Sequence, residues 1–240
     1  MFEKLHERLI ISGTLEAVTP LHIGSGKPEL EIGEIDMPIL RTPDGQPYIP
    51  GSSLKGRVRA EAERIARERG LEVCSPPNTR NMCGTIKKNS SPEEFCICCR
   101  IFGTAGDVSV ASKVKFRDSY PQGKVESLLE RTGIAIDRET GAVARRALYT
   151  IEAVPAGVKF NLEIVADNLS DDELKLLLAA LKSVEDSALG GSSSRGFGKV
   201  KININEVCRR TAGYYLGEEE EQKLKGGDLE SWLKEKGGFR

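Results

Sequence analysis

Apolar and polar residues alternate with a period of two along several stretches of the chain, and this pattern predicts β-strands. The first stretch, "RLIISGTLEAVTPLHIG", covers residues 8–24 and is closed by a proline and glycines. Residues 113–118 ("KVKFRD"), 159–166 ("KFNLEIVA") and 196–207 ("GFGKVKININEV") predict further strands. Within residues 131–157, apolar stretches flank "DRETGAVARR", which indicates a protruding hairpin or a long loop.

Two other stretches have the period of a helix. In "SSLKGRVRAEAERIARERG" (residues 52–70) apolar residues recur every three or four positions, Ser52 or Ser53 is a candidate N-cap, and Gly70 is a stop signal. In "SDDELKLLLAALKSVEDSALGG" (residues 170–191) Ser170 and Glu173 have the spacing of a capping box, and glycines follow the helix.

The predicted order is strand, helix, strands, helix, strand, with large insertions. This order fits a ferredoxin-like α+β sandwich, in which two helices cover one face of an antiparallel sheet. The other face of such a sheet is one that RNA-recognition domains often use.

Composition supports a globular protein. The 240 residues are 39% hydrophobic and 30% charged, and the length suits one large domain or two small domains fused closely. No apolar run approaches a membrane span, and the start "MFEKLHERLIISG" is charged where a signal peptide is apolar, so a cytoplasmic protein without a membrane partner is expected. The net charge is -1, but residues 55–69 contain six basic residues against three acidic ones.

Five of the six cysteines lie in "CSPPNTRNMCGTIKKNSSPEEFCICC", within an insertion spanning residues 71–103. Cys96 and Cys99 have the spacing with which two thiolates hold one tetrahedral Zn²⁺, and Cys74 and Cys83 can complete the set. A polar loop with no core of its own gains stability from such a structural zinc. The alternatives are a set of unlinked free thiols, or a site in which Cys98 replaces a neighbour.

The loop "LGGSSSRGFGKV" (residues 189–200) is rich in glycine but is not a nucleotide P-loop, since it follows a helix, precedes a strand and lacks Gly-Lys-Ser/Thr. Its backbone N–H groups and hydroxyls could hold a sugar-phosphate backbone; a flexible turn is the alternative. With only His6 and His22 present, a Ser/His/Asp triad is improbable. His22, taken alone, is more typical of a structural hydrogen-bonding residue.

Taken in order, "LHIGSG", "IDMPILRTPDGQPYIPGSSLKGRVR", "CICCRIFGT" and "LGGSSSRGFGKV" resemble the RAMP proteins of type III CRISPR effector complexes, most closely the Csm3 and Cmr4 group of backbone subunits. The resemblance covers roughly residues 9–207. It implies a single RAMP domain over residues 1–217, a thumb-like hairpin over residues 131–157, and a charged tail over residues 218–240 that has no counterpart in the family.

The resemblance also implies a function. Such subunits polymerise along a guide RNA (crRNA), together with other effector subunits, and an Asp in the loop before "PGSSLKG" cleaves target RNA at regular intervals. The matching residue here is Asp36. A carboxylate that binds Mg²⁺ or Mn²⁺, or that accepts a proton, can promote in-line attack by the RNA 2′-OH, leaving a 2′,3′-cyclic phosphate and a 5′-OH. Taken alone, Asp36 would be an Asx-type loop cap.

The same resemblance implies RNA contacts along four segments of the chain, although for the hairpin arginines a contact with a neighbouring subunit or plain surface charge is equally open. Lys55 and Arg59 lie one helical turn apart, which suits adjacent phosphates. The predicted RNA-binding residues are His22, Ser52, Ser53, Lys55, Arg57, Arg59, Arg138, Arg145, Arg146, Gly191, Ser192, Ser194, Arg195 and Gly196.

Three other functions compete with this one. The first is a non-catalytic RNA-binding scaffold of the same kind of complex, although the acid that such paralogues lose is present here. The second is a Cas6-like endonuclease that processes guides; such enzymes usually rely on a His, Lys or Tyr constellation, which two histidines barely supply. The third is a zinc-stabilised RNA-binding module outside CRISPR systems.

Overall fold

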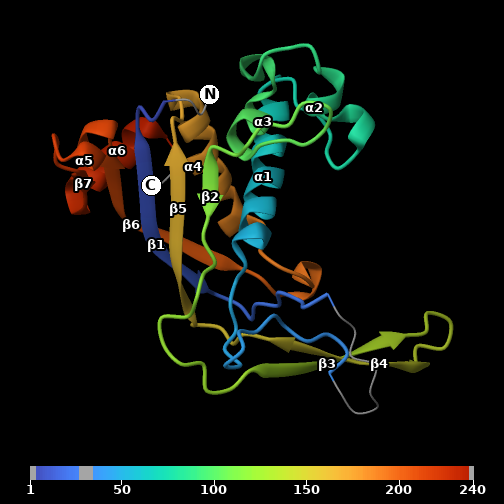
Figure 1. Ribbon diagram of the computed structural model, residues 1–240. Helices are drawn as coiled ribbons and strands as arrows, with labels where there is room; N and C mark the ends of the chain where they lie inside the picture. Colours follow the sequence, from blue (N-terminus) through green and yellow to red (C-terminus); the bar gives the residue numbers. More distant parts are fainter. Residues whose placement is uncertain (1–3, 27–34, 238–240) are drawn as a thin grey trace.

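The computed structural model describes residues 4–26 and 35–237, and only the backbone of residues 145–147. Five strands form an antiparallel sheet in the order β2-β5-β1-β6-β7 (Figure 1). They are β1 (Arg8–Ala17), β2 (Val114–Phe116), β5 (Lys159–Asp167), β6 (Val200–Arg210) and β7 (Gln222–Leu224). The mixed α+β class with an antiparallel sheet, predicted from the sequence, is confirmed.

Strand β1 lies at the centre and pairs with β5 on one side and β6 on the other. Its register with β6 shifts between Ser12 and Gly13. A Cβ at Gly13 would lie 2.1 Å from the carbonyl oxygen of Asn203, so only glycine allows the two backbones to approach here.

Helices α1 (Gly51–Glu68) and α4 (Asp171–Asp186) pack against each other and cover one face of this sheet (Figure 1). Leu54 and Val58 of α1 and Leu177 of α4 are fully buried in the core, and burial of each such side chain contributes about 1.5–3 kcal/mol. The predicted capping box of the second helix is confirmed: the Ser170 hydroxyl accepts from the Glu173 N–H, and the Glu173 carboxylate accepts from the Ser170 N–H.

The predicted N-cap at Ser52 or Ser53 is wrong, because α1 begins at Gly51 and Pro50 occupies the N-cap position, which places both serines inside the first turn. Asp118 performs the capping from a distant part of the chain: its Oδ1 accepts from the Gly51 N–H at 2.8 Å. A Cβ at Gly51 would lie 2.1 Å from the Phe116 carbonyl oxygen. The Pro-Gly pair thus lets the helix start directly against strand β2.

The predicted hairpin is confirmed as a separate two-stranded sheet of β3 (Leu129–Ile136) and β4 (Val143–Ala153). It projects away from the helices and the main sheet (Figure 1). Ile134, Ile136, Val143 and Leu148 are exposed along it, which leaves an apolar surface on the part of the hairpin that contacts no core.

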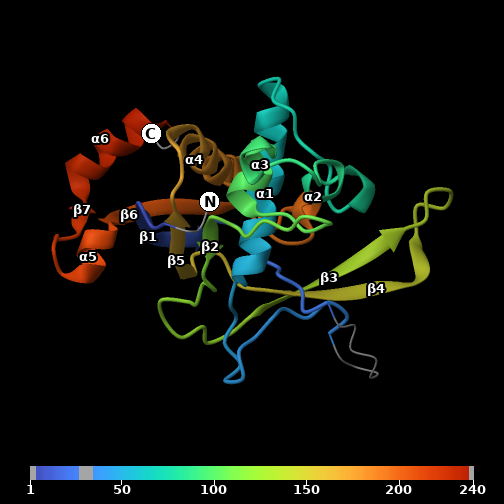
Figure 2. The same cartoon turned by 45° about the horizontal axis from the view of Figure 1, so that its top comes forward.

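The cysteine insertion and the C-terminal segment lie on opposite sides of the molecule (Figure 2). The insertion folds into η1 (Thr79–Asn81), α2 (Cys83–Ile86), η2 (Pro92–Glu94) and α3 (Ile97–Phe102) beside α1. The segment expected as a charged tail contains β7 and α6 (Gly226–Lys236), which bury Leu229 and Leu233 against the core. The short α5 (Ala212–Leu216) joins β6 to this segment. Among the described residues, no helix is both long and apolar enough to span a membrane.

Candidate functional site

Asp36 lies at the base of the hairpin. It begins the Asp36 segment (residues 36–44), whose first residues run extended alongside β4. The exposed Asp36 carboxylate accepts from the Thr150 N–H through Oδ2 at 2.7 Å. The next residue, Met37, donates its N–H to the Thr150 carbonyl and accepts from the Glu152 N–H, both at 3.1 Å. Asp36 is therefore solvent-accessible but fixed to a strand by backbone pairing.

Glu152, which the sequence analysis missed, is buried beside this segment with 2% of its surface exposed. Its Oε2 accepts from the Ile39 N–H at 3.1 Å, and its Oε1 pairs with the Arg41 guanidinium. The sequence does carry a signal for it: Glu152 is a charged residue within the apolar run Ile151–Val154, where a charge needs a specific partner.

His22 links its own segment to strand β4 and to the glycine-rich loop. Its ring is buried, and Nδ1 donates to the Glu152 carbonyl oxygen at 2.7 Å. Its own carbonyl accepts from the Gly191 N–H at 2.8 Å, and a Cβ at Gly190 would lie 2.3 Å from that oxygen. These are the contacts of a structural hydrogen-bonding residue, and the predicted RNA contact of His22 stays a prediction.

The glycine-rich loop packs against the same end of the hairpin. Ser192 (φ 58°) and Gly196 (φ 88°) have left-handed backbones on either side of the short η3 (Ser193–Arg195), which is exposed. The Arg195 guanidinium lies 5.3 Å from the centre of the Tyr149 ring, at cation–π distance. Phe197 is buried with Ile151 and Ala153 in a small second core. Loop, hairpin base and Asp36 segment are thus parts of one surface.

The predicted RNA contacts on α1 differ in their surroundings. Ser52 is exposed and Ser53 half-buried at the start of the helix. Lys55 makes no ion pair within the described part of the chain; burial and the nearby Arg59 lower the pKa of its ammonium. Arg57 pairs with the buried Glu61 at 3.0 Å.

Arg59 turns toward the cysteine insertion. Its guanidinium pairs with Glu63 at 2.9 Å, donates to the Gly103 carbonyl at 2.9 Å and donates to Cys99 Sγ at 3.6 Å. Burial opposes its charge, but the hydrogen bond with Glu63 and the nearby Cys99 leave the pKa of Arg59 raised. The residue faces the cluster, and its predicted phosphate contact is untested.

In the hairpin, Arg138 is exposed in the turn at the tip. Arg145 and Arg146 lie in β4, and their side chains fall outside the described part of the structure.

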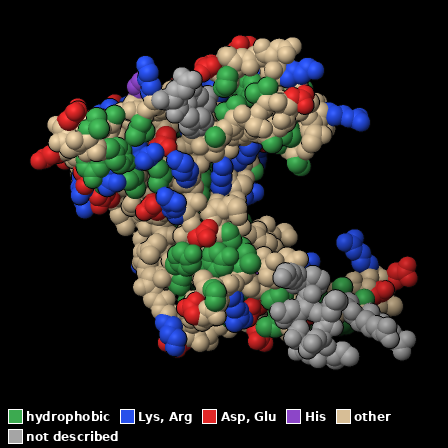
Figure 3. Space-filling view, viewed as in Figure 1, with side chains coloured by type: hydrophobic (Ala, Val, Ile, Leu, Met, Phe, Trp, Pro, Cys, Tyr) green, Lys and Arg blue, Asp and Glu red, His purple; other side chains and the backbone are tan. Residues whose placement is uncertain are grey.

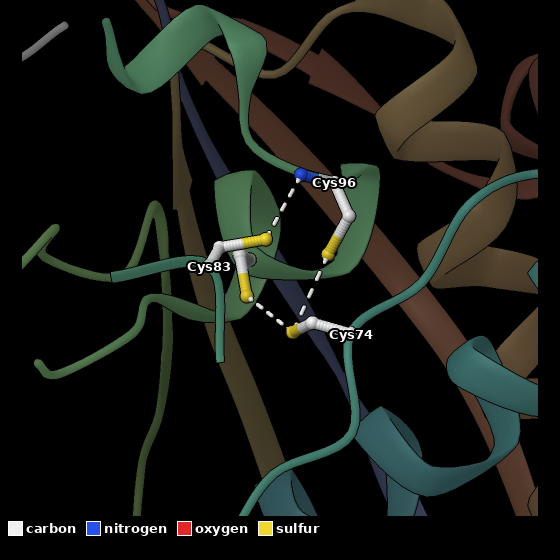
Figure 4. A group of neighbouring side chains, drawn as sticks. Cys74, Cys83 and Cys96 are labelled. Atoms are coloured by element: carbon white, nitrogen blue, oxygen red, sulfur yellow. Dashed lines mark hydrogen bonds between the residues drawn. The ribbon is translucent and has the colours of Figure 1, made fainter. Parts of the chain in front are cut away.

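The four predicted zinc ligands come together. The Sγ atoms of Cys74, Cys83, Cys96 and Cys99 all lie within 4.8 Å of one another, and Cys98 is not part of this group. Cys74 Sγ is 3.3 Å from Cys99 Sγ and 3.8 Å from Cys96 Sγ (Figure 4). Zn–S bonds of about 2.3 Å require S···S edges of about 3.8 Å in a tetrahedron, so the group fits a zinc ion.

Electrostatics within the group favour one thiolate. A hydrogen bond from Cys99 lowers the pKa of Cys96 to about 4, and this same bond raises the pKa of Cys99. Burial raises the pKa of Cys83 to about 11 and that of Cys98 to about 12. A metal that binds all four thiolates must therefore displace protons from Cys83 and Cys99.

The open face of the main sheet is occupied by ion pairs. Asp167 pairs with Arg8 at 2.6 Å and with Lys115 at 2.8 Å, and these bonds hold its pKa low against the effect of burial. Basic and acidic side chains are intermixed over this face (Figure 3). The aromatic residue of the three central strands, Phe160, is buried in the core. The face therefore lacks, in the described strands, the exposed rings on which RNA-recognition domains stack bases.

Comparisons with known proteins agree with this arrangement. The model of the RAMP superfamily matches residues 14–201. A protein of Methanocaldococcus jannaschii named CRISPR system Cms endoribonuclease Csm3 is 34% identical, over 91% of this chain and 88% of its own length. A protein of the same name from Methanothermobacter thermautotrophicus is 32% identical, over 95% and 96% of the two chains.

Two solved structures have the same overall fold. The crystal structure of Methanopyrus kandleri Csm3 superimposes with a TM-score of 0.66 at 25% identity, over 97% of this chain and 96% of that one. A chain of the Csm3–Csm4 subcomplex of the type III-A CRISPR–Cas interference complex superimposes with a TM-score of 0.58 at 26% identity, over 96% and 97%. The chain thus belongs to the RAMP superfamily and is related to its Csm3 proteins.

Proposed function

We propose that this protein is a crRNA-binding backbone subunit of a type III CRISPR effector complex, and that it cleaves complementary target RNA through Asp36. One observation supports this most directly. An exposed carboxylate is fixed to the hairpin base, beside the glycine-rich loop, in a relative of proteins named endoribonucleases. Both the acid and its supports lie within the part of the chain that the RAMP model matches.

The fold is of the kind that this function requires. The order β1-α1-β2-β5-α4-β6, with the sheet order β2-β5-β1-β6, supports a ferredoxin-like core. The projecting β3–β4 hairpin takes the part of the thumb. Its exposed apolar side chains give it a surface for bases or for a neighbouring subunit.

Cleavage uses the RNA's own nucleophile. The 2′-oxygen, once its proton is removed, attacks the adjacent phosphate in line, and the bond from phosphorus to the 5′-oxygen breaks. The 5′-oxygen takes a proton from water and leaves as a 5′-OH, and a 2′,3′-cyclic phosphate remains. Asp36 accepts the 2′-OH proton or orients the phosphate; Oδ2 is held by Thr150, and Oδ1 has no partner among the described residues. A bound Mg²⁺ or Mn²⁺ would supply charge neutralisation at the phosphate. One exposed carboxylate with a free oxygen fits such an ion, and RNA and water oxygens would complete its shell.

The four-cysteine group serves structure in this proposal. Four thiolates close a tetrahedral zinc site and leave no position for a substrate. The ion would hold the cysteine insertion against α1, with Arg59 donating to the sulfur of Cys99.

Partners follow from the function. The protein would bind crRNA and target RNA and would contact copies of itself and other effector subunits, in the cytoplasm where these RNAs occur. One structural relative is a chain of a Csm3–Csm4 subcomplex, which supports a neighbouring subunit of a different kind.

The test is cleavage of a labelled, guide-complementary RNA by the guide-loaded complex, with Mg²⁺ or Mn²⁺. The parent should cut at regular intervals, and Asp36→Ala should bind the RNA without cutting it. Asp44→Asn is the matched control, because Asp44 is another exposed aspartate of the same segment. Tight binding without cutting by the parent would make the protein a scaffold, and cutting of repeat RNA alone would favour a guide-processing enzyme.

A further inference from the structure

We infer that Glu152 is the positioning residue that places Asp36 on the target phosphate; this inference rests on the proposed function. Glu152 is 2% exposed, and a carboxylate this deeply buried needs partners for its charge. Both of its side-chain partners come from the Asp36 segment: the N–H of Ile39 at 3.1 Å and the guanidinium of Arg41. The buried charge of Glu152 is therefore satisfied entirely by groups of the Asp36 segment, and these bonds hold the segment against β4.

The backbone of Glu152 holds two further pieces of the site. Its N–H donates to the Met37 carbonyl at 3.1 Å, and its carbonyl accepts from His22 Nδ1 at 2.7 Å. The Leu40 N–H donates in turn to the Ile23 carbonyl at 2.9 Å. The Asp36 segment thus lies between β4 and the residues next to His22. Glu152 of β4 is bonded both to this segment and to His22.

This placement sets the register of Asp36 on β4. Asp36 is bonded to Thr150, two residues before Glu152, and Ile39 is bonded to the Glu152 side chain. A slip of one residue would move an extended segment by about 3.3 Å and turn its side chains to the other side. In-line attack does not tolerate such a shift, because even a 1 Å displacement of a catalytic group can lower a rate by about 100-fold.

The alternative is that Glu152 only stabilises the fold, and the variants are chosen to separate the two roles. Glu152→Gln keeps the volume and one acceptor for Ile39 but removes the charge that Arg41 neutralises. Arg41→Gln breaks the same ion pair by changing its more exposed partner, so it provides the test if Glu152→Gln fails to fold. Glu173→Gln is the matched control, because Glu173 is equally buried and paired with Lys113 at 2.7 Å in another part of the fold.

The experiment measures single-turnover cleavage, target-RNA affinity and mapped cut positions for guide-loaded complexes of the parent and each variant. For Glu152→Gln we expect cleavage about 10- to 100-fold slower, an unchanged Kd, and cuts that spread to neighbouring phosphates. Arg41→Gln should act in the same direction, and Glu173→Gln should match the parent.

Opposite results are readily recognised. Parent-like rate and cut sites in Glu152→Gln, alongside an inactive Asp36→Ala, overturn the positioning role and leave the proposed function standing. A rate that falls only in proportion to folded protein or to RNA affinity also overturns it, since that is a structural effect. A parent complex that does not cut, or an Asp36→Ala complex that cuts normally, overturns the proposed function and this inference together.

Discussion

The cysteine cluster and the Asp36 segment are both candidate sites, but they are built in opposite ways. The cluster gathers four sulfur atoms within 4.8 Å from one insertion, and three of its cysteines are buried. The Asp36 segment offers a single exposed carboxylate, supported by backbone bonds to β4. The cysteine cluster supplies all four ligands of a metal from the chain itself. The Asp36 segment supplies one carboxylate, and RNA would provide the nucleophile and most of the ligands of any metal ion.

This difference indicates which site should respond to which perturbation. Zinc binding by four thiolates is coupled to local folding, so its loss should change stability with or without RNA. The Asp36 carboxylate contributes nothing to a core, so its loss should change cleavage and leave stability alone.

Cys96→Ser or Cys99→Ser should lose the bound zinc and lower the unfolding temperature by ten degrees or more, on the order of several kcal/mol, because metal-binding free energy contributes to folding. Zinc content by mass spectrometry of the native protein and thermal unfolding measure this. Cys208→Ser is the control, since Cys208 lies on β6 outside the cluster and a serine can keep the bond to Glu206. Equal zinc content in mutant and parent would exclude the site.

Asp36→Ala should slow target cleavage by about 100-fold or more, the range expected for a lost general base. Zinc content and unfolding temperature should stay those of the parent, because the residue is exposed. A variant that also lost zinc or stability would break the separation between the two sites. Cleavage kinetics and unfolding should be measured on the same preparation.

The sequence was a better guide to the cluster than to the Asp36 segment, and the reason is physical. Ligand spacing in the chain predicted the four cysteines whose sulfur atoms meet in the structure, with Cys98 as an open alternative. The supports of Asp36 come from β4, more than a hundred residues away, and no local pattern couples Thr150 or Glu152 to it. Periodicity predicted the long core strands and the helices α1 and α4, but not the short helices of the cysteine insertion or the β7–α6 segment. The capping of α1 by Asp118 depends on tertiary structure.

Zinc binding should weaken as the pH falls. The raised pKa values of Cys83 and Cys99 keep both thiols protonated near neutrality, so at least these two must release a proton when zinc binds. Each proton released makes the zinc affinity about tenfold lower for every unit by which the pH falls. Calorimetric titration of zinc in buffers of different ionisation enthalpy counts the protons, and release of fewer than two would contradict the raised pKa values.

The smallest effects should come from two residues one turn apart on α1. Lys55→Ala should weaken guide-RNA binding about tenfold or less and make its salt dependence shallower by about one unit of slope, as expected for one lost phosphate contact. Arg59→Ala should instead speed the transfer of zinc to a chelator, by about 10-fold, because Arg59 donates to the Cys99 sulfur. Measuring both quantities on both variants decides whether Arg59 belongs to the RNA surface, as the sequence predicts, or to the cluster. A shallower salt slope in Arg59→Ala with unchanged zinc release would show that Arg59 contacts the RNA. In that case its guanidinium must leave Glu63 and Gly103 to reach a phosphate.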